Sequence, residues 1–153
     1  MSKTLYRNGN SYQNGRFEFE GKKSTTVVST LDSIMEIGVA YNRGVTGSGN
    51  SDREIRRISV SGDSIKYSNR NPALEINFNN LSLTQRKRLG DSMLSGDIRA
   101  RLLTALEIAK EGVEAFLFLQ RGGVSEHAKT ETRKLEEILS DIKNPDTKVM
   151  QVK

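Results

Sequence analysis

Residues 74–85, Leu-Glu-Ile-Asn-Phe-Asn-Asn-Leu-Ser-Leu-Thr-Gln, contain the point at which the chain changes from strand-like to helix-like patterning. Leu74, Ile76 and Phe78 are spaced by two, which places them on one face of a β-strand. Shortly afterwards, residues 82–85 (Ser-Leu-Thr-Gln) match a capping box, the pattern that begins a helix. This stretch predicts a β-rich half, residues 1–80, followed by a helical half, residues 81–146, and a tail, residues 147–153.

Short alternating runs fill the N-terminal half. Residues 16–20 (RFEFE) and 35–41 place apolar side chains at every second position, and residues 58–60 and 65–67 do so on either side of a Ser-Gly-Asp turn at 61–63. The Asn-Gly pairs at 8–9 and 14–15 are hairpin signals, because type I′ turns need positive φ at both central residues. No helical period falls between the runs, so we predict an antiparallel sheet of about five or six short strands.

Three helices are predicted after this sheet. The first ends near Ser95 and Gly96, and the second begins at Asp97 and ends at the glycines 122–123. The third begins at Ser125 and ends before residues 144–146 (Asn-Pro-Asp). The weakly alternating tail could add an edge strand. The expected fold is therefore α+β, a single domain over residues 1–153 in which three C-terminal helices pack on one face of the sheet.

The composition argues against catalysis and against cofactors. The 153 residues contain no cysteine and one histidine, His127, so thiolate metal sites, disulfides and cysteine nucleophiles are excluded. The glycine-rich residues 44–51 lack the lysine that a phosphate-binding Walker loop needs and are typical of a hairpin loop. Glu18 and Glu20 could bind a divalent cation, but they fit the solvated face of a strand better. We expect no enzyme activity, no metal and no small-molecule substrate.

Apolar stretches are too short to span a membrane, and the N-terminus has no signal-peptide pattern. We therefore expect a protein that is neither secreted nor membrane-bound, located in the cytoplasm or within a virus particle.

Tyrosine lies beside arginine and asparagine three times in the β-rich half, at residues 6–8, 41–43 and 67–71. An aromatic ring can stack on a base while a neighbouring guanidinium contacts phosphate, the combination that single-stranded nucleic acid requires. Tyr41 continues the apolar run 35–39, so it could lie in the core or at its rim. Tyr6 and Tyr67 lie outside such strong stripes and are expected to be exposed.

Basic residues are concentrated in the same half. The chain carries a formal charge of +5; residues 1–23 and 41–70 each contribute +3, whereas residues 106–147 contribute −3. Positive charge favours a partner that carries phosphates. The candidate nucleic-acid-binding residues are Tyr6, Arg7, Arg16, Lys22, Lys23, Tyr41, Arg43, Arg53, Arg56, Arg57, Tyr67 and Arg70.

The second helix has an apolar stripe wide enough for two partners, with one face on the sheet and the other on a neighbouring helix or a second subunit. The candidate residues for an oligomer interface are Leu103, Ile108, Leu117, Phe118 and Leu119. The leading hypothesis is a non-catalytic, homo-oligomeric protein that binds nucleic acid, preferably single-stranded DNA or RNA. The alternative is a structural assembly subunit, such as a component of a phage or virus particle, whose positive charge is incidental or faces an enclosed genome.

Overall fold

A computed structural model describes residues 6–7, 10–11, 14–45, 51–69, 74–119 and 126–152. The strands and helices, in chain order, are β1 (Tyr6–Arg7), β2 (Asn10–Ser11), β3 (Gly15–Glu20), β4 (Ser24–Leu31), β5 (Ile34–Val45), β6 (Ser51–Ser61), β7 (Ser64–Asn69), β8 (Leu74–Phe78), α1 (Leu83–Leu94), α2 (Ile98–Leu119), α3 (Glu126–Lys143) and β9 (Lys148–Val152).

The main sheet has seven antiparallel strands in the order β8-β7-β6-β5-β4-β3-β9. Strands β3 to β8 form a meander, because each is joined to the next by a short connection and pairs with it. The C-terminal tail returns to the opposite edge and adds β9 beside β3. The α+β prediction is confirmed. The N-terminal half supplies six strands of the sheet, and the tail supplies the seventh.

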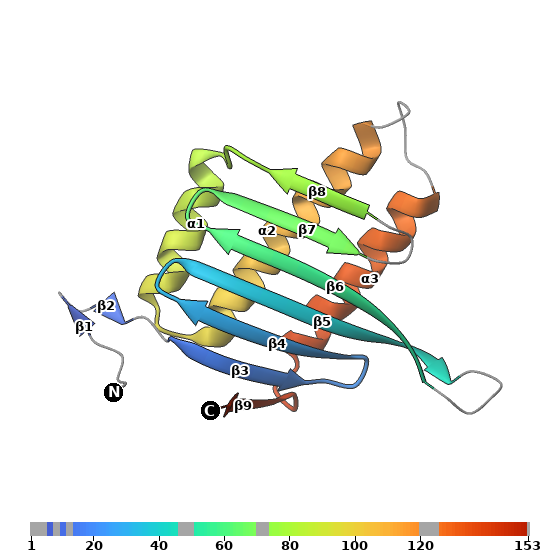
Figure 1. Ribbon diagram of the computed structural model, residues 1–153, viewed down its shortest axis with the longest axis horizontal. Helices are drawn as coiled ribbons and strands as arrows, with labels where there is room; N and C mark the ends of the chain where they lie inside the picture. The colour runs from blue at the N-terminus through green and yellow to red at the C-terminus, as the bar shows by residue number, and fades with distance from the viewer. Residues whose placement is uncertain are drawn as a thin grey trace.

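All three helices lie on one face of this sheet, and Figure 1 looks onto the other face. Cross-strand rows of apolar side chains point toward the helices; one row runs Phe17, Val28, Ile37, Ile58, Tyr67 and Ile76. They pack in a single core against the apolar sides of α1, α2 and α3. The two-residue period of the strands thus assigns every second side chain to the core and the rest to the uncovered face.

The predicted helix boundaries agree with the structure where it describes them. The Ser82 hydroxyl accepts a hydrogen bond from the Gln85 amide, and the Gln85 side chain accepts one from the Ser82 amide, which confirms the capping box. The Asp97 carboxylate accepts from the Arg99 amide at the start of α2. Residues 122–123 and 125, expected to end α2 and cap α3, lie outside the described residues.

The prediction of a hairpin at Asn14-Gly15 is wrong. Gly15 has a φ of 139° and begins β3, whose partners are β4 and β9 rather than β2. The Asn14 side chain instead accepts a hydrogen bond from the Asp32 amide in the β4–β5 turn. An asparagine whose side chain accepts a hydrogen bond from another segment of the chain gives the same sequence signal as a turn residue. The other Asn-Gly pair, residues 8–9, lies outside the described residues, between the paired strands β1 and β2.

Asp141 joins the last part of α3 to the β3–β4 turn. Its carboxylate accepts hydrogen bonds from the amides of Lys22, Lys23 and Ser24 at 2.9–3.0 Å and from the Ser24 hydroxyl at 2.9 Å. Gly21 allows this approach, because a Cβ on Gly21 would lie 2.2 Å from an Asp141 oxygen. The carboxylate thus satisfies three turn amides and anchors α3 to the turn that joins β3 and β4.

We expect Asp141→Asn to lower the free energy of unfolding by about 2 kcal/mol, because hydrogen bonds to a charged acceptor are lost. Gly21→Ala should destabilise by about 1–3 kcal/mol through overpacking. Urea denaturation of purified variants measures both changes.

Gly62→Ala is the matched control, since nothing lies within 4 Å of a Cβ at Gly62. It should change stability by less than about 0.5 kcal/mol. If Gly21→Ala is tolerated as well as Gly62→Ala, the close packing of Gly21 against Asp141 is contradicted.

Candidate functional site

The structure places the two tyrosines that it describes in full on the helix-covered face. Tyr67 is 0% exposed and Tyr41 is 9% exposed. The expected exposure of Tyr67 is therefore wrong: it stands opposite Ile58 and Ile76 in a core row of the sheet. Of the two positions left open for Tyr41, core or rim, the structure shows the core. The Tyr41 hydroxyl donates a hydrogen bond to Glu137 of α3. Neither ring can stack on a base at the uncovered face.

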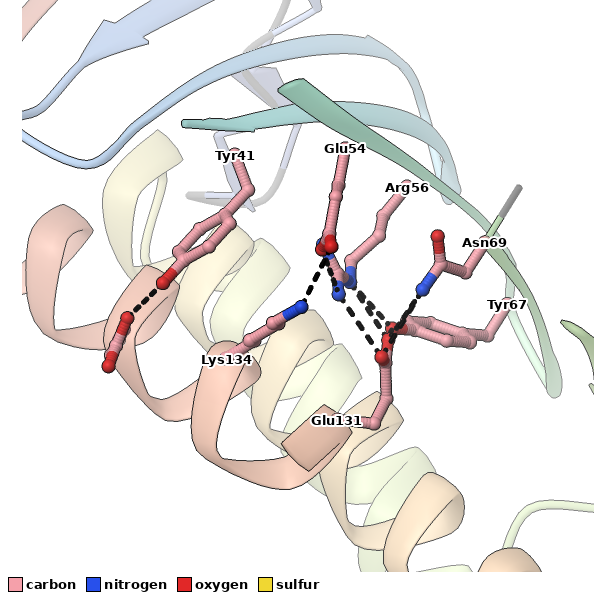
Figure 2. A network of polar contacts seen from close by, with 8 residues as sticks. Tyr41, Glu54, Arg56, Tyr67, Asn69, Glu131 and Lys134 are labelled. Atoms are coloured by element: carbon pink, nitrogen blue, oxygen red, sulfur yellow. Dashed lines mark hydrogen bonds and ion pairs between the residues drawn. The ribbon is translucent and has the colours of Figure 1, made fainter. Parts of the chain in front are cut away.

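Arg56 is also buried, at 0% exposure, and is paired with Glu131 of α3 (Figure 2). Its Nε lies 2.8 Å from one Glu131 carboxylate oxygen, and its Nη2 lies 3.1 Å from the other. The Tyr67 hydroxyl and the Asn69 amide donate to the same carboxylate. The assignment of Arg56 as a phosphate contact is therefore wrong, because its guanidinium is used inside the fold.

A second carboxylate completes this network. Glu54 accepts hydrogen bonds from Arg56 Nη2 at 3.0 Å and from Lys134 Nζ at 2.7 Å (Figure 2). The exposed fraction of Glu54 is 2%, and that of Asn69 is 3%. The network joins β6 and β7 to the first half of α3 through charge-assisted bonds. These side chains cannot contact a ligand while α3 stays in place.

The network shifts the ionisation of its members. Burial opposes charge on Glu131, but the hydrogen bonds and charge of Arg56 outweigh it and hold the Glu131 pKa below 4.5. Burial likewise opposes charge on Glu54, whose pKa is lowered by Lys134 and Arg56. Burial raises the pKa of Tyr67, and the neighbouring Glu131 raises it further. Burial, with the bond to Glu137, raises the pKa of Tyr41 to about 12.

Two of the predicted basic residues, Arg16 and Arg57, are exposed on the uncovered face of the sheet. They flank a shallow hollow whose lining also includes Ser29, Glu36, Gly38 and Ser59. A Cβ on Gly38 would have nothing within 4 Å, so the floor of the hollow is open backbone.

A third cation, Lys66, is exposed on the same face and is paired with Glu75 at 2.9 Å. Sequence reasoning did not select Gly38, although a glycine inside a strand of β-formers signals close approach of another group.

Lys22 and Lys23 lie in the β3–β4 turn and are exposed. This turn is at the end of the sheet from which the β5–β6 hairpin extends (Figure 1). Arg43 and Arg53 are on that hairpin, although their side chains lie outside the described part of the chain.

Arg70 lies outside the described residues, as do the side chains of Tyr6 and Arg7 in β1. The pairing of β1 with β2 forms a separate small sheet near the other end of the main sheet (Figure 1). Among the candidates whose side chains the structure describes, Tyr41, Arg56 and Tyr67 lie on the helix-covered face, Arg16 and Arg57 on the uncovered face, and Lys22 and Lys23 in the β3–β4 turn.

The candidate oligomer residues on α2 divide in the same way. Ile108 is 1% exposed within the core of the chain itself, so its assignment to a subunit interface is wrong. Leu103 is partly buried against that core. The side chains of residues 117–119 (Leu-Phe-Leu) lie outside the described residues. A homo-oligomer stays a prediction.

The helical layer presents several ion pairs between its helices: Lys110–Glu136 at 3.4 Å, Lys143–Glu107 at 3.7 Å and Arg88–Glu111 at 3.1 Å. These pairs occupy the surface of α1, α2 and α3 with charge that is already compensated within the chain. Other cations of the helical layer, such as Arg86 on α1 and Arg133 on α3, are exposed, so the helices also present positive charge.

Within the described residues, no group of three or more histidine and acidic side chains is arranged to hold a metal ion. In the same part of the chain, no helix is both long enough and apolar enough to cross a membrane. No protein-family model, curated protein or solved structure matches this chain. Its function therefore has to be argued from its own surface.

We expect Glu131→Gln to reduce the free energy of unfolding by about 3 kcal/mol, because Arg56 is left buried beside a neutral amide. The double variant Arg56→Met, Glu131→Met removes both charges and should be less destabilised than Glu131→Gln alone. Urea unfolding of both variants tests this. A double variant that is less stable than Glu131→Gln would contradict the idea that the loss comes from the buried charge of Arg56, which keeps only Glu54 as a charged partner in Glu131→Gln.

The lowered pKa values also predict acid sensitivity. A carboxylate whose folded pKa lies below its unfolded value of 4.5 contributes full stability above that pH and loses it as the pH falls through the folded pKa. Stability should therefore decline below about pH 4.5, and less steeply in Glu131→Gln than in the wild type. Urea midpoints measured between neutral pH and pH 3 give the two slopes; equal slopes would exclude Glu131 as a contributor.

Proposed function

We propose that this protein binds single-stranded nucleic acid on the uncovered face of its sheet, with Arg16 and Arg57 as phosphate contacts. The observation that carries the proposal is the placement of these two exposed cations on either side of the Gly38 hollow. The helices, with their compensated ion pairs, lie on the opposite face (Figure 1).

The uncovered face of a β-sheet suits single-stranded nucleic acid better than a duplex. Bases of an unpaired strand can lie flat on a sheet, while its flexible backbone follows cations that are not in a line. The uncovered face has small side chains near its centre, with Val27, Gly38 and Ser68 side by side on neighbouring strands together with Arg57. A flat, open surface of this kind leaves room for bases without any side chain having to move.

The charge on this face is mixed, which sets the strength of binding. Glu18, Glu36 and Glu75 alternate with Arg16, Arg57 and Lys66 across the strands. We therefore expect contact with few phosphates and a modest dependence of affinity on salt. Lys22, exposed in the β3–β4 turn, extends the positive charge toward the end of the sheet that carries the β5–β6 hairpin. Lys23 beside it is paired with Glu137 of α3 at 3.8 Å. A nucleic-acid strand that extends beyond the sheet at that end meets further positive charge.

Replacing Arg16 and Arg57 by glutamine should weaken binding and flatten its salt dependence. Each phosphate contact on single strands contributes about 0.7 to the slope of log K against log salt, so two contacts contribute about 1.4. Fluorescence anisotropy with labelled single-stranded DNA and RNA, titrated at several salt concentrations, measures the slope. Duplexes of the same length should bind more weakly.

The matched control is Lys87→Gln with Arg133→Gln, which removes the same charge from exposed positions on α1 and α3. This control should bind like the wild type. Equal slopes for both double variants, or no measurable binding by the wild type at low salt, would contradict the proposal.

A further inference from the structure

We infer that the Gly38 hollow is a seat for one nucleotide whose base carries an amino group, as cytosine does, and that Glu36 accepts a hydrogen bond from that amino group. This inference rests on the proposed function and adds a position and a base preference to it.

The hollow has an open floor at Gly38. Gly38 lies between Val27 on β4 and Arg57 on β6, in a row of side chains on the uncovered face. Its neighbours in the row therefore stand above a floor that has no side chain of its own. Because nothing lies within 4 Å of a Cβ at this position, a planar ring can rest on the exposed peptide backbone.

Two cations line the hollow from different strands. Arg16 is on β3 and Arg57 is on β6, three strand spacings apart, or about 14 Å across the sheet. Both line the hollow. Phosphates on the two sides of a seated nucleotide can each meet one guanidinium, while the base lies between them.

The Glu36 carboxylate supplies a hydrogen-bond acceptor in the hollow. Glu36 is exposed, and its Oε1 accepts a hydrogen bond from the Ser59 hydroxyl at 2.6 Å, which restricts the carboxylate's orientation. A carboxylate has about four acceptor positions, so it can accept further bonds. It accepts well from the exocyclic amino group of cytosine, whereas the O4 atom of thymine or uracil offers it only another acceptor.

Two single substitutions test the seat. Gly38→Val fills the hollow without changing charge, and it should not impair folding because β-branched residues suit strands and the space is open. We expect it to weaken binding of short cytosine oligonucleotides at least tenfold, with an unchanged or higher melting temperature. Ala40→Val, at the next position along β5 on the same face, is the control and should bind like the wild type.

Glu36→Gln tests the base preference. The wild type should bind oligo-cytosine about fivefold more tightly than oligo-thymine or oligo-uracil, and Glu36→Gln should abolish that difference. The variant should also bind oligo-thymine more tightly than the wild type does, because a negative charge is removed beside the phosphates.

The outcomes distinguish the inference from the proposed function. If Gly38→Val and Ala40→Val bind alike, or if the wild type shows no base preference, the nucleotide seat is overturned. In that case, weaker binding and a flatter salt dependence after replacement of Arg16 and Arg57 would still support nucleic-acid binding on this face. If the arginine substitutions have no effect, the proposed function fails and the seat fails with it.

Discussion

A charge at the centre of a sheet needs a partner, and in this protein the partner of Arg56 is Glu131 on α3. Burying either charge alone would cost several kcal/mol, so their contact determines where the first half of α3 can lie. Tyr67, Asn69 and Glu54 turn toward the same point because they share the two charges. Asp141 fixes the far end of α3 against the β3–β4 turn. Two polar anchors thus hold one helix across the sheet.

This arrangement explains why the surface differs from the one that residue types suggest. Tyrosine, arginine and asparagine side by side resemble a nucleic-acid platform, but in β6 and β7 they face α3 and complete the buried network (Figure 2). The cations that remain free to meet solvent on the sheet are at alternate positions on the other face, such as Arg16 and Arg57. A one-residue difference in position along a strand therefore separates a structural arginine, Arg56, from a candidate binding residue, Arg57.

The uncovered face combines cations, carboxylates and a glycine floor, and under the proposed function these features favour selective over strong binding of nucleic acid. Few phosphates can be neutralised there, because carboxylates alternate with the arginines across the strands. Glu36 would be costly beside a phosphate, yet it is a good acceptor for an amino group. The same group that weakens a general attraction for nucleic acid can thus discriminate among bases.

The sequence by itself determined the α+β class, the antiparallel sheet and the capping box at Ser82, because local period and capping chemistry decide these features. It left the edge strand of the tail as a possibility, and the strand order came from the tertiary structure. It also contained hints that were not used: Glu54 and Arg56 follow the core alternation of Ile58 and Val60, and Glu131 falls on the 4-3-4 stripe of Leu135, Ile138 and Ile142. Only the tertiary structure decided which charges are buried and which arginines are free. Composition and spacing locate a side chain on a face of its own element, whereas pairing across elements depends on which face the helices cover.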